Sequence, residues 1–245
     1  MSKTINQDRV ANEIAHGKFL AQGSTEAIWG WDSAAGKHRA VKRAAKIIAA
    51  AQLAPGKHAL EIGCGTGMFT RMFADSGARI TANDVSPDLI EIAQKNNPEV
   101  NFIWMPFEEL PSTAQYNAII GSSVLHHLDL DAALQKSIEL LRPGGCLAFA
   151  EPNMLNPQVF AERTFLRNAL DYVSPDETAF VRWHLAKKLK QLGFINIHLT
   201  PFDWLHPAIP ATWINTIESV GRVLEALPAV REFSGSLLIS CQKPE

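Results

Sequence analysis

The chain has 245 residues, of which 47% are hydrophobic and 20% charged, with 23 Lys and Arg against 25 Asp and Glu. This balance excludes a disordered or collagen-like chain, and the net charge of −2 argues against nucleic acid as the main partner, because phosphate binding normally leaves a basic footprint. The three cysteines have no CxxC spacing, which predicts reduced thiols and no metal site. The polar start lacks an apolar signal segment and no stretch is long enough to span a bilayer, so we expect a cytoplasmic protein with no membrane partner.

Helices and strands alternate in the predicted elements. A first helix covers Lys37–Leu53 after a polar leader and ends at Pro55-Gly56. The elements that follow are expected at His58–Ile62, Met68–Ser76, Arg79–Asn83, Pro87–Asn96, Asn101–Met105, Asn117–Gly121, Asp131–Leu141 and Cys146–Ala150. Such alternation with short Gly and Pro connections predicts an α/β fold, with a mostly parallel sheet and helices on both faces.

The pattern after Glu151 is less regular. A helix is expected over Asp176–Leu192, and strands over Phe194–Leu199 and Ser236–Cys241. The long insert Pro201–Phe233 lies between these two strands. Long inserts in a compact fold are often lids or binding loops, so we expect this one to form a cap.

The strongest local signal is a strand that runs into glycines and then into a helix. Gly63, Gly65 and Gly67 allow positive φ angles and let a ligand approach the backbone, while the helix N-terminus favours a negative group. Asp84 ends the next strand, where a carboxylate can accept hydrogen bonds from ribose hydroxyls. The pattern therefore predicts a nucleotide-like ligand at this edge of the sheet.

The spacing of the glycines discriminates between cofactors. A nicotinamide or flavin site has the GxGxxG pattern, whereas here the third glycine comes one residue earlier and position 68 is Met. Glu61, two residues before the first glycine, could pair with a cationic amine, which a dinucleotide does not present.

The segment Glu61–Gly67 resembles the first motif of the class I methyltransferases, which use S-adenosylmethionine. Further resemblance runs through Asp84–Pro87, Phe107–Pro111, Tyr116–Leu128 and Leu141–Gly145, so that it covers roughly Lys57 to Pro152. It implies S-adenosylmethionine as cofactor and a Rossmann-like, doubly wound, seven-stranded sheet whose last strand is antiparallel. We expect one domain over residues 1–245, with an N-terminal lid and helix at 1–54, a cofactor-binding core at 55–151, and cap insertions at 152–180 and 201–233.

The resemblance also implies which residues bind the cofactor. Asp84 would hold the ribose, and an N-terminal segment with Trp31 and Arg39 would fold over the ligand, whereas Lys42 and Arg43 are expected on a solvated helix face. The family often has Asp where this chain has Pro106, so adenine would be held by Phe107 and Glu108. The full set is Glu61, Gly63, Cys64, Gly65, Gly67, Asp84, Val85, Phe107, Glu108, Ser122, Trp31 and Arg39.

Catalytic groups are harder to assign, because methyl transfer from a sulfonium depends mainly on alignment and needs a base only for a weakly acidic acceptor. His127 and Glu151 follow the fourth and fifth strands and are candidates for catalysis, whereas His126, Trp204 and His206 are candidates for substrate contacts. Structural roles remain open: the histidine pair could cap a turn and shape the cofactor pocket, Glu151 could bind a backbone loop, and His206 could simply pack.

The cap is rich in aromatic residues, which predicts an enclosed, largely apolar pocket for a small-molecule acceptor. These residues are Phe160, Phe165, Tyr172, Phe180, Trp183, Trp204 and Trp213. Ser122-Ser123-Val124-Leu125 stands where amino-directed methylases carry an Asn-Pro-Pro-Tyr-like tetrapeptide, so O-methylation is favoured, with C-methylation second. A nicotinamide-dependent oxidoreductase and an inactive cofactor-binding relative remain as alternatives.

Overall fold

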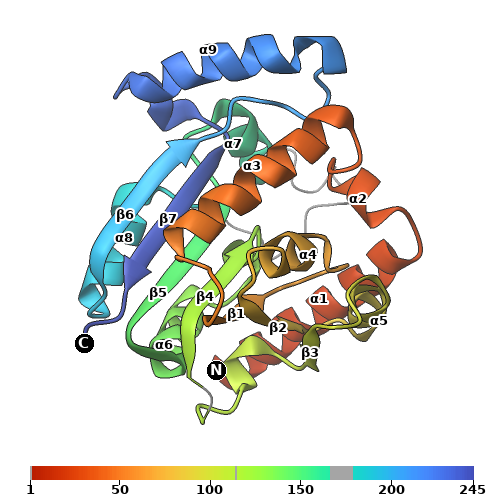
Figure 1. The fold of residues 1–245 in the computed structure, drawn as a ribbon, viewed down its shortest axis with the longest axis vertical. Helices are drawn as coiled ribbons and strands as arrows, with labels where there is room; N and C mark the ends of the chain where they lie inside the picture. The colour runs from red at the N-terminus through yellow and green to blue at the C-terminus, as the bar shows by residue number, and fades with distance from the viewer. Residues whose placement is uncertain (1, 114, 166–178) are drawn as a thin grey trace.

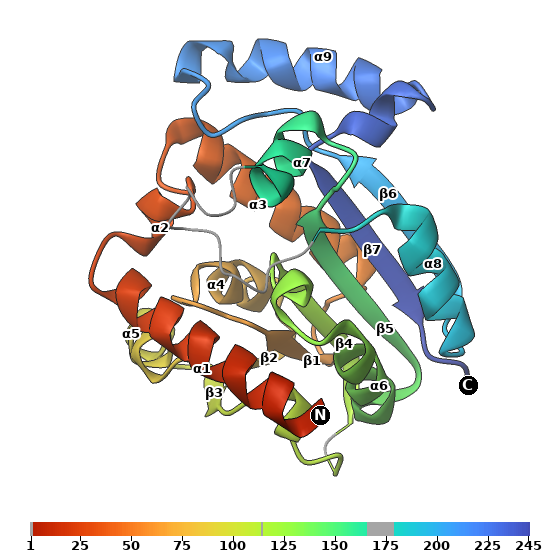
Figure 2. The same cartoon turned by 180° about the vertical axis from the view of Figure 1, so that it is seen from behind.

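The computed structural model describes residues 2–113, 115–165 and 179–245. A seven-stranded sheet runs through the described part, with helices packed on both of its faces (Figures 1 and 2). The strands are β1 His58–Ile62, β2 Arg79–Asp84, β3 Asn101–Trp104, β4 Tyr116–Ser122, β5 Leu141–Pro152, β6 Ile195–Phe202 and β7 Ser236–Gln242.

The α-helices begin with three N-terminal ones and continue between and after the strands. They are α1 Ser2–Ala21, α2 Thr25–Ile28, α3 Ala34–Ala50, α4 Met68–Ala74, α5 Pro87–Asn96, α6 Leu130–Leu140, α7 Pro157–Thr164, α8 Arg182–Gln191 and α9 Ile214–Ala226. Short 3₁₀ turns are η1 Phe107–Glu109, η2 Leu125–His127, η4 Ala211–Trp213 and η5 Val230–Phe233.

The strand order is β3-β2-β1-β4-β5-β7-β6. All pairs from β3 to β5 are parallel, and β7 is antiparallel to both of its neighbours. The order reverses direction at β1 and β4, so the connections leave a crevice between the carboxyl ends of these strands, where open α/β sheets bind ligands. The predicted mixed sheet with an antiparallel last strand is confirmed.

The core lies on both faces of the sheet because most residues of its central strands are apolar and buried, whichever face they point to. In β5, Ala148 and Ala150 face the side covered by α3, α4 and α5, whereas Leu147 and Phe149 face the side covered by α6 and α8. Successive side chains of a strand point to opposite faces, so a continuous apolar run is the signature of a strand buried on both sides.

Several predicted boundaries are wrong for identifiable reasons. The helix predicted over Lys37–Leu53 is α3, which begins three residues earlier because the Ser33 side chain accepts a hydrogen bond from the Gly36 amide. The polar leader forms α1, whose apolar residues do not gather on one face. Strand β5 begins already at Leu141, with an irregular register against β4 before Cys146.

Further differences lie after β5. The helix expected from Asp176 begins only at Arg182, because Phe180 forms a bridge with Asn153; residues 166–178 of this region lie outside the described part. Helix α7 was not predicted, although Asn156 caps it and Pro157 opens it. The long insert contains the helix α9.

Replacement of Phe149 tests the central position of β5 in the core. Because Phe149 is fully buried, Phe149→Ala is expected to lower the free energy of unfolding by about 3–5 kcal/mol, measured by urea denaturation. Phe165→Ala is the matched control, since that ring is 75% exposed and its loss should change stability by less than about 0.5 kcal/mol. Equal losses in the two variants would contradict this account of the core.

Candidate active site

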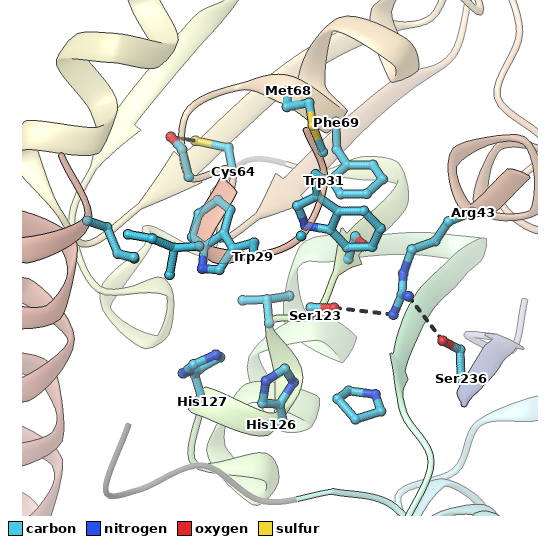
Figure 3. A pocket seen from close by; sticks show the side chains of 18 of the residues that line it. Trp29, Trp31, Arg43, Cys64, Met68, Phe69, Ser123, His126, His127 and Ser236 are labelled. Carbon is cyan, nitrogen blue, oxygen red and sulfur yellow. Dashed lines mark hydrogen bonds between the residues drawn. The ribbon is translucent and has the colours of Figure 1, made fainter. Parts of the chain in front are cut away.

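A cavity of about 590 Å³ opens at the carboxyl edge of the sheet. Its floor comes from the ends of β1, β2, β4 and β5 and from the start of β7, and its walls come from α1, α3, α7 and residues 203–207. Figure 3 shows side chains from these segments turned toward the same space, with Trp29 and Cys64 on one side and Arg43 and Ser236 on the other. The volume lies in the range of small-molecule sites.

The glycine turn between β1 and α4 is shaped by close contacts. Gly63, Gly65 and Gly67 all have positive φ angles, 62°, 53° and 79°. A Cβ at Gly63 would lie 2.2 Å from Cγ2 of Val124, and one at Gly65 would lie 3.0 Å from the Trp29 ring. Gly63, Cys64 and Gly65 line the cavity, whereas Gly67 lies against α5 and begins α4. The prediction of a ligand contact at Gly67 is therefore replaced by a packing role.

Asp84 ends β2 and lies across the turn from the glycines. Its Oδ2 accepts a hydrogen bond from the Gly65 amide at 2.8 Å, and its Oδ1 accepts one from the Ser86 amide at 2.9 Å. Burial raises the pKa of Asp84, although these backbone hydrogen bonds oppose the shift. The carboxylate is thus fixed beside the cavity, with lone pairs on both oxygens left for further hydrogen bonds.

Most of the other residues predicted to contact the cofactor on this side line the cavity, but one does not. Val85, Phe107 and Ser122 line the cavity as predicted. Glu108 follows Phe107 in η1 but is not among the described residues that line the cavity. A backbone contact with Phe107 is compatible with this arrangement, and recognition by the Glu108 side chain stays a prediction.

Glu61 lies fully buried near the end of β1. Its side chain is only 1% exposed and lies next to Thr70 of α4, on the sheet face opposite to that of Ile62, which lines the cavity. Burial raises the pKa of Glu61 to about 8. Its Oε2 has no hydrogen-bond partner among the described residues, and an ion pair between Glu61 and a cationic ligand group stays a prediction.

The N-terminal segment covers the cavity as predicted. Trp31 lines it and packs edge-on against Phe69, with their ring centroids 5.5 Å apart. The guanidinium groups of Arg39 and Arg43 both lie against the Trp31 ring, 5.2 and 5.7 Å from its centroid. The Thr66 hydroxyl donates to Glu26 of α2 at 2.6 Å, which ties this segment to the glycine turn.

Arg39 and Arg43 both line the cavity but have different partners. Arg39 donates from Nε to Oδ2 of Asp203 at 2.9 Å, and its Nη2 lies 2.9 Å from the same oxygen, so its charge is balanced by the cap. Arg43, expected in solvent, is 3% exposed and donates to the Ser236 hydroxyl, the Ser123 hydroxyl and the Ala150 carbonyl. Lys42 instead pairs with Glu218 of α9.

Arg43 is a buried cation whose direct partners are all neutral. No carboxylate of the described residues lies within ion-pair distance of it, and its Nε has no hydrogen-bond partner there. Burial lowers the pKa of Arg43 to about 10, so the group stays charged at neutral pH. Because buried charges are normally paired, this cavity-lining guanidinium is suited to an anionic group of a ligand.

A histidine and a glutamate form a buried pair below the cavity. His126, in η2, lies with Nδ1 2.6 Å from Oε2 of Glu151, at the end of β5. The second oxygen, Oε1, accepts hydrogen bonds from the amides of Val124 and Leu125, both at 3.0 Å. His126 lines the cavity, but Glu151 is fully buried behind it and is not among the described lining residues. Direct contact between Glu151 and a substrate is therefore not supported.

Burial and hydrogen bonding shift the pKa values of both His126 and Glu151. Burial lowers the pKa of His126 to about 4, and the neighbouring His127 acts in the same direction. Burial alone would raise the pKa of Glu151, but hydrogen bonds from His126 and from the two amides outweigh it and hold this pKa below its ordinary value. At neutral pH the pair thus consists of a neutral imidazole and a carboxylate.

His127 faces the N-terminal helix. Its Nδ1 lies 3.2 Å from Oε1 of Glu13, which also lines the cavity from α1. Helix α1 crosses α5 so closely that a Cβ at Gly17 would lie 2.4 Å from Oγ of Ser86. The sequence analysis missed this helix, so His127, predicted as catalytic, is joined to a part of the site that was not anticipated.

The wall of the cavity formed by α7 and residues 203–207 is more polar than the aromatic lining that the sequence predicts. Trp204 and His206 line it as expected, together with Gln158, Glu162 and Arg163 of α7. His206 lies 3.0 Å from Nε2 of Gln158. Of the other aromatic residues expected to line a pocket, Phe180 is in the core, and the rings of Phe160, Phe165, Trp183 and Trp213 are on the surface. Tyr172 lies outside the described residues.

Two features are absent from the described residues. No group of three or more His, Cys, Asp or Glu there is arranged to hold a metal ion. None of the helices in that part of the chain is both long and apolar enough to cross a membrane.

Comparison with known proteins decides the family. Residues 59–145 match the family model described as "Methyltransferase domain". The chain is 32% identical over 164 residues to the ubiquinone biosynthesis O-methyltransferase of Coxiella burnetii, covering 60% of this chain and 69% of that protein. The chain belongs to the class I S-adenosylmethionine-dependent methyltransferases.

Two other similarities are consistent with this family. The malonyl-[acyl-carrier protein] O-methyltransferase of Serratia marcescens is 30% identical over 142 residues, which cover 57% of this chain but only 55% of that protein. The N-methyltransferase NodS of Bradyrhizobium japonicum, solved in complex with S-adenosyl-L-homocysteine, has the same fold with a TM-score of 0.61 and 15% identity, covering 96% of this chain and 100% of that one. The methyltransferase family supports neither the nicotinamide alternative nor its cofactor.

The contact between Gly63 and Val124 provides a test of the methyltransferase glycine turn. Gly63→Ala is expected to lose about 1–2 kcal/mol of stability from the left-handed backbone and a further 1–3 kcal/mol from the clash with Val124. Val124→Ala in the same chain should restore only the second part, as measured by a double-mutant cycle in urea. If the stability losses of the two single variants simply add up in the double variant, a Cβ at position 63 does not clash with Val124.

Proposed function

We propose that this methyltransferase transfers a methyl group from S-adenosylmethionine to an oxygen atom of a small-molecule acceptor. The observation that carries the proposal is the single cavity that joins the glycine turn and Asp84 to the His126–Glu151 pair. The names of the Coxiella and Serratia relatives, both O-methyltransferases, support oxygen as the accepting atom.

The adenosine end of the cavity fits the nucleoside of this cofactor. Asp84 is placed to accept hydrogen bonds from the ribose hydroxyls, because its carboxylate is fixed by two backbone amides and still has lone pairs. Gly63 and Gly65 remove the Cβ atoms that would otherwise keep a ligand away from the turn. Phe107 would contact the adenine ring at the end of the cavity beyond β2.

The other end of the cofactor, an amino acid, requires a cation for its carboxylate. Arg43 meets this need better than Arg39, because Arg39 is already paired with Asp203. The guanidinium of Arg43 lies between the ends of β4, β5 and β7, held by Ser123, Ala150 and Ser236. A carboxylate at this point would complete the pairing of a buried charge.

The chain's main contribution to the reaction is alignment and exclusion of water. S-adenosylmethionine supplies a methyl group on a sulfonium, which needs an in-line approach by the acceptor and leaves a neutral thioether. The roof formed by Trp29, Trp31 and α1 covers the cavity, and holding two reactants in line can supply roughly 7–11 kcal/mol of the barrier. The polar wall from α7 and residues 203–207 would orient a small, hydrogen-bonding acceptor.

Binding of S-adenosylhomocysteine, the demethylated product, tests the cofactor site. We expect micromolar affinity in a calorimetric titration, and a loss of roughly 10- to 150-fold in Asp84→Asn, corresponding to about 1.5–3 kcal/mol for hydrogen bonds to a charged group. Asp75→Asn removes an exposed carboxylate from the end of α4 and should leave the affinity unchanged. Unchanged affinity in Asp84→Asn would refute the ribose assignment.

Arg43 is tested with a pair of ligands that differ in the amino-acid part. Arg43→Met should weaken S-adenosylhomocysteine by at least about tenfold but leave 5′-methylthioadenosine, which lacks the carboxylate, nearly unaffected. Arg39→Met serves as the comparison, with a smaller effect on both ligands because that arginine is bound to Asp203. Equal weakening of the two ligands in Arg43→Met would show that Arg43 only supports the fold.

A further inference from the structure

We propose that the outer face of α9 is a docking surface for α9 of a second copy of this chain, and that the two copies form an antiparallel, two-fold symmetric pair. This interface lies on the insert between β6 and β7. It goes beyond the methyl transfer proposed above, because neither the cofactor nor the acceptor takes part in it.

Exposed apolar side chains gather on the insert. Among the described residues, twelve large hydrophobic side chains are exposed, and five of them belong to positions 213–233: Trp213, Val220, Val223, Leu227 and Phe233. Helix α9 is the outermost element at one end of the molecule in both views (Figures 1 and 2). Single exposed apolar residues need no explanation, whereas a group of them on one element indicates an interaction surface.

The exposed residues of α9 follow a seven-residue repeat. Trp213, Val220 and Leu227 are seven residues apart, and Thr216 and Val223 each follow one of them by three residues. All five are exposed, and we call them the seam. Their spacing is that of the a and d positions of two heptads, with which one α-helix packs along another. The outer face of α9 is therefore shaped for a second helix.

The opposite side of α9 is attached to the rest of the chain. A Cβ at Gly221 would lie 3.4 Å from Cβ of Trp204, and Glu218 and Glu225 both pair with Lys42 of α3. At 3.6 residues per turn, these three positions of α9 lie on roughly the opposite side of the helix from the seam. Trp204 also lines the cavity, so the docking surface lies behind the cavity wall and faces away from it.

The residues that flank the seam carry no charge. Ser219 and Ala226 lie along one side of it, and Ile217 and Leu224 lie along the other. A two-fold axis brings identical patches together, and in an antiparallel helix pair each flank meets its own copy. A charged flank would therefore repel itself, whereas these small or apolar side chains allow two copies to approach closely.

The charges of α9 also speak against other occupants. Helices that lie on anionic membranes carry several Lys and Arg residues beside their apolar face. Helix α9 has a single one, Arg222, whose Nη2 donates to the Ser219 hydroxyl. Lys42, on the neighbouring helix, is balanced by Glu218 and Glu225. A neutral helix with the same apolar repeat fits this surface best, and a second copy supplies it.

Full overlap of the two seams defines the register. In an antiparallel pair, every seam residue meets the partner's seam only if the middle one, Val220, lies on the two-fold axis. Trp213 then lies beside Leu227 of the partner subunit. The antiparallel direction also places the positive N-terminus of each helix beside the negative C-terminus of the other. Because two heptads are a short seam, we expect a dissociation constant in the micromolar range.

Sedimentation equilibrium from about 1 to 200 μM tests the dimer over the micromolar range. The average mass of the wild type should rise with concentration from that of one chain towards twice that mass. Val220→Glu brings two carboxylates together on the two-fold axis and should weaken association roughly 100-fold or more. Val220 is half exposed, so this variant should keep the wild-type melting temperature and the wild-type affinity for S-adenosylhomocysteine.

Arg222→Glu is the matched control, because it changes an exposed charge of the same helix outside the seam and its flanks. It should leave the association constant within about twofold of the wild-type value, since an exposed charge is largely screened by solvent and salt.

Disulfide formation tests the register independently. Val220→Cys should form a linked dimer under mild oxidation, whereas Asn215→Cys, exposed on another side of α9, should not. The three cysteines of the chain are buried and do not compete. Trp213→Cys and Leu227→Cys should link to each other when the two variants are mixed, but neither should link to itself, because the helices are antiparallel.

Each contrary outcome has a definite meaning. Wild-type protein that stays monomeric at every concentration would overturn the dimer; if it then sediments with vesicles of phosphatidylcholine and phosphatidylglycerol and Val220→Glu does not, the face binds lipid instead. A dimer that survives Val220→Glu, or one in which Val220→Cys forms no link, would overturn α9 as the interface. The proposed function is tested separately by the titration with S-adenosylhomocysteine, which needs no dimer.

Discussion

The buried guanidinium of Arg43 is the interaction on which the arrangement of the site depends. It reaches from α3 to Ser123 after β4, to the Ala150 carbonyl in β5, and to Ser236 at the start of β7. One side chain thus connects α3 to three strands that are far apart in sequence. Because Trp31 lies on the same guanidinium, the roof over the cavity is positioned by the same contact.

The cap is attached to this frame through a second set of charges. Arg39 binds Asp203, whose backbone adopts a positive φ of 78°, and Lys42 binds Glu218 on α9. Three cationic residues of one helix therefore serve three purposes: Arg43 faces the cavity, Arg39 the base of the cap, and Lys42 its outer helix. Through these contacts, α3 holds residues 203–207 and α9 in place relative to the strand ends of the cavity. Partly buried ion pairs with several contacts hold such an arrangement better than ion pairs on the surface do.

The sequence was sufficient for the sheet, the glycine turn and Asp84, because these depend on local patterns: apolar runs, glycines at fixed spacing and a carboxylate at a strand end. It was insufficient wherever a side chain's direction depends on tertiary contacts. Nothing local distinguishes Arg39 from Arg43, which are both basic residues of one amphipathic helix. Periodicity alone also does not say that the Glu61 side chain is fully buried within a strand that is covered on both faces. Helix α1 lacks an apolar stripe and gave no amphipathic signal at all.

The antiparallel last strand has a consequence for how this scaffold can change its substrate. Strand β6 runs up to the cavity edge and β7 starts back from it, so that Phe202 and Ser236 are direct partners in the sheet. The connection between them, from Asp203 through α9 to Gly235, is a long insert whose two ends lie next to each other. The free-energy cost of closing a loop between two such adjacent ends rises only slowly with the length of the loop. The segment from Asp203 to Gly235 can accordingly vary in length while the sheet stays as it is.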